Sequence, residues 1–139
     1  MWSPPDDSRT LVLIYDGRCA FCERNSARLV RWVRRGSLVR VSSSEPGVLE
    51  RYPSLTREQC DRAMQLVLPD GRIVSGAQAA AEALKTRRWT GWLASVYYLP
   101  GLRWVFDRLY NWVARNRYRF SRSATVCTTS GCAVAAKRP

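Results

Sequence analysis

The 139-residue chain has no histidine, and this absence excludes more chemistry than any other feature of its composition. Without histidine the chain has no Cys-His dyad, no Ser-His-Asp triad and no imidazole ligand for a metal ion. Any reactive side chain must therefore be activated by its local backbone or by neighbouring charges.

Targeting signals and long apolar runs are also missing. Residues 1–7 hold two prolines, Asp6 and Asp7, where a secretory signal would carry basic residues followed by an apolar stretch. The apolar segment 93–99 is far shorter than the ~20 residues that span a bilayer. Five unevenly spaced cysteines do not suggest a structural disulfide framework. We expect a cytoplasmic protein whose thiols are reactive.

Lysine is scarce, with only Lys85 and Lys137, so arginine carries most of the formal charge of +12. The basic residues are spread over segments 24–40, 51–72 and 103–122. Such a spread favours a solvated basic surface over a nucleic-acid arm, and no specific nucleic acid is predicted. An anionic membrane surface remains the alternative partner.

The central stretch reads Asp16-Gly17-Arg18-Cys19-Ala20-Phe21-Cys22. It follows an apolar run at 11–15, typical of a strand buried on both faces, and it opens a helical pattern that we expect to end at Gly36 with a left-handed cap. The N-terminus of a helix favours negative charge, so a cysteine there ionises more readily than a free thiol. A second cysteine one turn later predicts a thiol-disulfide redox site.

Further elements follow in order. Segment 38–41 alternates as a second strand, parallel to the first. Segment 48–54 has no clear period and is expected to be irregular. Thr56 and Gln59 form a capping-box pattern for a short helix to about residue 62, which includes Cys60 as an inert residue. Pro69-Asp70-Gly71 predicts a hairpin between strands 64–68 and 72–74.

Ser75 and Gln78 form a second capping-box pattern, before an alanine-rich helix at 79–85. The resulting order, β-α-β-α-β-β-α, predicts an α/β, thioredoxin-like fold with a mixed four-stranded sheet. We expect an N-terminal arm at 1–9, one domain at 10–120 and a flexible tail at 121–139.

The helical extension 90–120 is rich in aromatic residues and is divided by Pro100-Gly101. After the break, an apolar stripe with helical spacing is expected to pack on the core; it comprises Leu102, Val105, Phe106, Leu109, Trp112 or Val113, and Asn116. The alternative is that this amphipathic helix lies on a membrane surface.

The stretch from Tyr15 to Cys22 resembles the DCC family of thiol-disulfide oxidoreductases, which is named after one aspartate and two cysteines in the pattern Y-D-G-x-C-x-x-C. Similar stretches recur in the right order at 69–72, 75–79 and 110–119, so the resemblance runs from about Leu11 to Phe120. It implies a thioredoxin-like fold and oxidoreductase activity. The chain departs from the usual pattern at Ala20, where proline is common, and has no proline near 62–64, where thioredoxins carry a cis-proline.

In this interpretation Cys19, nearer the helix start and more exposed, attacks a partner disulfide, and Cys22 resolves the mixed disulfide. Asp16 is predicted to be partly buried and to exchange the proton of Cys22. The alternative for Asp16 is that it only accepts backbone N–H groups of the turn. We expect four neighbouring residues to support the site, namely Gly17, Arg18, Phe21 and Arg24. The two arginines would favour the thiolate form of Cys19. The partners would be protein or small-molecule thiols and disulfides, with no cofactor.

Two other functions stay open. Cys19, Cys22, Cys127 and Cys132 could form a four-thiolate zinc site, although zinc ligand pairs usually lie on short knuckles. Alternatively, Cys127 and Cys132 could be a second redox pair or simply flexible thiols. The chain could also be a basic binding or membrane-surface module in which the redox motif is residual.

Overall fold

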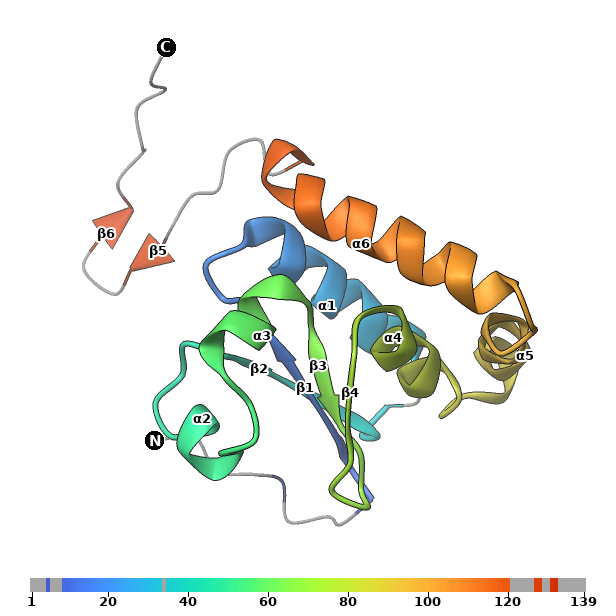
Figure 1. Cartoon of the computed structure of the whole chain (residues 1–139). Coiled ribbons are helices and arrows are strands. Elements are labelled where there is room, and N and C mark those ends of the chain that lie inside the picture. Colours follow the sequence, from blue (N-terminus) through green and yellow to red (C-terminus); the bar gives the residue numbers. More distant parts are fainter. Residues whose placement is uncertain (1–4, 6–8, 34, 121–126, 129–130, 133–139) are drawn as a thin grey trace.

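The computed structural model describes residues 5, 9–33, 35–120, 127–128 and 131–132, and its centre is one mixed sheet (Figure 1). Strand β1 (Leu11–Tyr15) pairs in parallel with β2 (Leu38–Ser42) and antiparallel with β3 (Gln65–Val67). Strand β4 (Ile73–Ser75) completes the hairpin, so the strand order is β2-β1-β3-β4. The predicted α/β, thioredoxin-like arrangement is confirmed.

The predicted arm at 1–9 and tail at 121–139 lie largely outside the described residues. In the tail the structure describes two short strands, β5 (Cys127–Thr128) and β6 (Gly131–Cys132), which pair antiparallel with each other.

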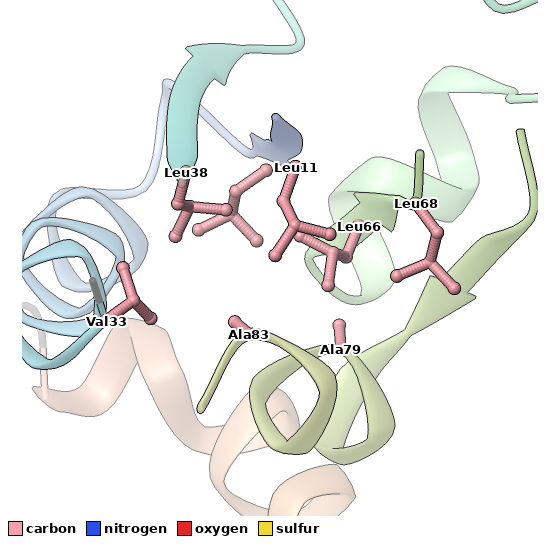
Figure 2. Packing of buried hydrophobic residues seen from close by; sticks show 8 residues of the cluster. Leu11, Val33, Leu38, Leu66, Leu68, Ala79 and Ala83 are labelled. Carbon is pink, nitrogen blue, oxygen red and sulfur yellow. The ribbon is translucent and has the colours of Figure 1, made fainter. Parts of the chain in front are cut away.

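Helices cover both faces of the sheet, which explains why β1 is apolar at every position. Leu11 and Leu13 face helices α1 (Ala20–Trp32) and α4 (Gly76–Leu84), in the cluster that Figure 2 shows around Val33, Leu38, Leu66, Leu68, Ala79 and Ala83. Val12 and Ile14 face the opposite side, where α2 (Val48–Arg51) and α3 (Arg57–Arg62) lie. A strand buried on both faces holds the turn that follows it firmly in place.

Two expected boundaries were wrong. Helix α1 ends at Trp32 instead of reaching Gly36, because Val33 turns to an extended conformation and buries its side chain in the core. Gly36 does adopt a left-handed φ of 78°, but in the turn before β2. Segment 48–54, expected to be irregular, contains the short helix α2, because Val48 packs into the second core cluster.

Of the two capping boxes, the first is confirmed and the second is wrong. The Thr56 hydroxyl accepts from Gln59 N–H at 3.3 Å, and the Gln59 side chain accepts from Thr56 N–H at 2.9 Å. Ser75 makes no side-chain capping bond to α4. It is the last residue of β4 and is paired with Gln65, so the pairing of β3 with β4 fixes its backbone conformation.

The C-terminal extension forms α5 (Arg88–Tyr97) and α6 (Leu102–Phe120), separated at Pro100-Gly101 as expected. Helix α6 lies across α1 and α4 (Figure 1). Its inner face is made by Tyr110, Val113, Ala114 and Arg117. The predicted packing of the apolar stripe is thus only partly confirmed: Val113 and Asn116 are half-buried, whereas Leu109 and Trp112 are 54% and 57% exposed.

The spacing of apolar residues could not reveal this, because an arginine occupies the most buried position of the helix. Among the described residues, no helix combines the length and apolar character needed to cross a bilayer.

Candidate active site

The motif turn joins the end of β1 to the start of α1 through local hydrogen bonds. The Asp16 carbonyl accepts from Cys19 N–H at 3.2 Å, and its carboxylate Oδ1 accepts from Arg18 N–H at 2.9 Å. Gly17 lies so close to the Ser42 hydroxyl of β2 that an added Cβ would collide with it. The backbone itself thus places both cysteines, with glycine allowing close approach to the sheet.

Cys19 is the N-cap of α1, as its place in the sequence predicted. Its Sγ accepts from the backbone N–H of Cys22 at 3.2 Å. The expectation that Cys19 is the more exposed of the pair was wrong, because Cys19 is 1% exposed whereas Cys22 is half-buried. Cys19 caps the helix with its side chain and is buried in that position. The position of Cys19 in the sequence does not by itself indicate this burial.

The Cys22 thiol holds its proton strongly, with a pKa raised to about 12. Burial is the largest cause, followed by a hydrogen bond with the Cys19 side chain and by the negative charge of Cys19. The guanidinium of Arg117 acts in the opposite direction, and the charge of Asp16 adds to the rise. Near neutral pH, therefore, Cys22 is a thiol that donates toward the Cys19 sulfur.

Sequence reasoning missed Arg117. Its Nη1 lies 3.7 Å from Cys22 Sγ, although the two residues are 95 positions apart. Its Nη2 donates to the Asp61 carbonyl and lies 3.5 Å from Asp16 Oδ2. The available signal was its place inside the family-like stretch 110–119.

The arginines that were predicted to support the thiolate lie elsewhere. Arg18 is exposed and pairs with Asp61 of α3 at 2.7 Å. Arg24 is exposed on α1. Phe21 is half-buried and packs near Phe120 of α6, with ring centroids 6.1 Å apart.

Asp16 is 1% exposed, so it is more deeply buried than expected. Its two carboxylate oxygens have different surroundings. Oδ1 accepts the backbone hydrogen bond of the turn. Oδ2 accepts no hydrogen bond from the part of the chain that the structure describes, but it faces the Arg117 guanidinium. The geometry accommodates both roles considered for this residue, because one oxygen is used structurally and the other is left for chemistry.

Met64 lies directly before β3, within the stretch 62–64 where a thioredoxin cis-proline was expected. Its backbone N–H donates to the Tyr110 hydroxyl of α6 at 3.2 Å, a bond that proline could not make. Met64 and Tyr110 also line a cavity of about 270 Å³ between α1 and α6, with Cys22 and Arg117 in its wall. Helix α6 thus closes the site from the side opposite the motif turn.

The predicted zinc set cannot be assembled from the side chains that the structure describes. Within those residues, no three cysteines or carboxylates cluster as metal ligands, and the side chains of Cys127 and Cys132 fall outside the description. The zinc site and the second redox pair therefore stay predictions. Cys60 lies on α3, as expected, and burial raises its thiol pKa.

Comparison with known proteins identifies the family to which the chain belongs. The family model described as DCC1-like thiol-disulfide oxidoreductase matches residues 13–123, from the middle of β1 to just beyond α6. The chain belongs to this family, in agreement with the resemblance of the motif turn. No curated protein and no solved structure gives a significant match.

Proposed function

We propose that the chain is a thiol-disulfide oxidoreductase in which Cys19 and Cys22 cycle between a dithiol and a disulfide. The observation that carries this proposal is the Cys19 sulfur at the N-terminus of α1, which accepts hydrogen bonds from the backbone N–H and the thiol of Cys22. Both donors favour negative charge on that sulfur, as does the helix end. Cys19 is therefore the proposed nucleophile of the pair.

The proposed exchange has two steps. The Cys19 thiolate attacks one sulfur of a partner disulfide, a Cys19–partner disulfide forms, and the other partner sulfur leaves as a thiolate that takes a proton. Cys22 then loses its proton and attacks Cys19 Sγ, which forms the Cys19–Cys22 disulfide and releases the second partner thiol. The cysteine pair loses two electrons and the Cys22 proton; the partner gains the two electrons, and its two thiols take up that proton and one from solvent.

Asp16 is the proposed acceptor of the Cys22 proton. Its Oδ2 is buried and has no hydrogen-bond partner among the described residues, so it can take a proton without first breaking a hydrogen bond. A carboxylate in such a position can act as the general base for the resolving thiol. The partners we propose are protein or small-molecule thiols and disulfides in the cytoplasm.

The test is a titration of the cysteine couple in glutathione buffers, read by alkylation and mass spectrometry. We expect one two-electron transition that the Cys19→Ser variant lacks. A potential near about −270 mV would indicate a reductase, and one near about −120 mV an oxidant. Failure of the couple to cycle, or one tightly held zinc ion per reduced chain, would contradict the proposal.

The exposed face of the C-terminal helices supports a second candidate function, peripheral binding to an anionic membrane. Trp89, Trp92, Leu109 and Trp112 are all at least half exposed, and the exposed arginines on α6 include Arg103, Arg108, Arg115 and Arg119. Aromatic residues flanked by arginine are typical of interfacial helices.

Sedimentation with vesicles of phosphatidylcholine and phosphatidylserine tests this candidate. We expect binding that weakens with salt and is reduced by Trp112→Glu, whereas Ser54→Glu, the same charge change at an exposed site near the opposite face of the sheet, has little effect. Equal binding by all three proteins would refute it.

A further inference from the structure

Arg117 is unlike the other arginines of α6. Arg103, Arg108, Arg115 and Arg119 are exposed, whereas the Arg117 side chain is 8% exposed and lies on the inner face of the helix. Burying a guanidinium is costly unless its charge is matched. Packing alone therefore does not explain why an arginine is buried at position 117.

The contacts of Arg117 are not those of an optimised structural ion pair. Its Nη2 lies 3.5 Å from Asp16 Oδ2, which is too far for a strong bidentate pair, and the Arg117 Nε and Asp16 Oδ2 atoms are both buried without a hydrogen-bond partner. Buried polar atoms left unsatisfied in this way concentrate at functional sites. The guanidinium is instead shared, because Nη1 approaches Cys22 Sγ at 3.7 Å.

This sharing matches the charge movement that the proposed resolving step requires. Before the step, Asp16 is a carboxylate and Cys22 is a thiol; after the proton moves, Asp16 is a carboxylic acid and Cys22 is a thiolate. One negative charge passes from oxygen to sulfur, and Arg117 contacts both atoms. The sum of the buried charges is the same before and after the transfer.

We propose that Arg117 is the positioning residue of the resolving step, a fixed counter-ion that holds the negative charge first on Asp16 and then on Cys22. This inference rests on the proposed function. It adds a residue from the far end of the chain to the motif, and it explains how a deeply buried carboxylate can exchange a proton with a buried thiol in a chain without histidine.

The effect of Arg117 on the ionisation of Cys22 depends on whether Cys19 is free or bound to a partner. In the reduced protein, the charge of Cys19 and its hydrogen bond oppose ionisation of Cys22. Once Cys19 is bound to a partner, that opposition is gone and burial is the main remaining cost, against which Arg117 acts. Two further groups lie against the pair itself: Arg117 Nη2 donates to the Tyr118 hydroxyl at 3.2 Å, and Arg18 Nε lies 3.8 Å from Asp16 Oδ1. The other titratable groups that line this cavity and its rim are Tyr15, Arg28, Cys60, Asp61, Arg62, Tyr110 and Arg115.

The two chemical steps can be timed separately with dithiobis-nitrobenzoate. The reduced chain should release one thionitrobenzoate when Cys19 attacks and a second when Cys22 resolves, and Cys22→Ser should abolish only the second release. We expect Arg117→Met to slow the second release about tenfold near neutral pH and to move its pH profile up by about one unit, with the first release unchanged. Arg117→Lys should recover part of the rate, and Arg115→Met on the exposed face should change neither release.

Equal slowing of both releases, or an unchanged second release in Arg117→Met, would overturn the assignment. If Arg117→Met leaves Asp16 unpaired and fails to fold, Asp16→Asn combined with Arg117→Met is compared with Asp16→Asn alone, and the double variant should still resolve more slowly. Equal rates in that pair would also overturn it.

Failure of the proposed function would look different, because the wild-type chain would then form no Cys19–Cys22 disulfide at all. Alkylation of Cys22 in the Cys19→Ser background would still measure whether Arg117→Met shifts its pH profile. No shift there would overturn the role of Arg117 independently.

Discussion

The two halves of the site, the motif turn and the inner face of α6, are built in opposite ways. The turn from Asp16 to Cys22 is held by backbone bonds between near neighbours and by the buried strand before it. The α6 half reaches the site through long side chains, chiefly Tyr110 and Arg117, that bond to backbone groups of Met64 and Asp61. The turn supplies the two cysteine sulfur atoms, and α6 supplies part of their surroundings.

This difference indicates which substitutions should abolish thiol-disulfide exchange and which should only change its rate. The largest effect is expected from the cysteines themselves. Cys19→Ser should reduce exchange to the uncatalysed rate, whereas Cys22→Ser should accumulate a mixed disulfide on Cys19 that mass spectrometry can map. A mixed disulfide that formed on Cys22 in the Cys19→Ser protein instead would reverse the assigned roles, in line with the greater exposure of Cys22.

Asp16→Asn tests the proposed role of Asp16 as proton acceptor. We expect the second, resolving release of thionitrobenzoate to slow by about 100-fold, the usual scale for losing a general base. The amide oxygen can still accept from Arg18 N–H, so the turn should persist, and the first release serves as the internal control. An unchanged rate of resolution across neutral pH would leave Asp16 with its turn-forming role alone.

The raised pKa of Cys22 predicts how the stability of the reduced protein depends on pH. The unfolded thiol ionises near pH 9, but the folded thiol ionises near pH 12, so the unfolded state loses its proton first. Stability is therefore complete below pH 9 and should fall by up to about 1.4 kcal/mol per pH unit as the pH rises toward 12. Urea unfolding of reduced wild type and of Cys22→Ser would measure this, and parallel curves for the two proteins would contradict it.

The smallest effect is expected on the α6 side. Tyr110→Phe removes the acceptor of the Met64 N–H and should lower the free energy of unfolding by about 1 to 3 kcal/mol, with exchange retained. Tyr98→Phe is the matched control, because Tyr98 bonds to Glu82 at the surface and its loss should cost less. Equal costs for the two variants would mean that the contact between α6 and the start of β3 does little to anchor the helix.

The sequence by itself determined the order of helices and strands along the chain, the strand-to-helix place of the two cysteines and the family, because these depend on local pattern. An apolar run, a turn with glycine and a cysteine at a helix start are each encoded within a few residues, and the structure confirms β1, β2 and the hairpin. The motif also singled out Asp16, whose burial follows directly from the strand before it.

Tertiary structure alone decided which cysteine is covered, which face of α6 packs inward and which cation approaches Cys22. Each of these depends on contacts between distant segments, and the pairing of Arg117 with Cys22 spans 95 positions. A buried arginine contradicts the periodicity that predicts helix faces, because its charge is matched by groups on another element. For the same reason much of the apolar stripe of α6, including Leu109 and Trp112, lies on the surface, although the pattern placed it in the core.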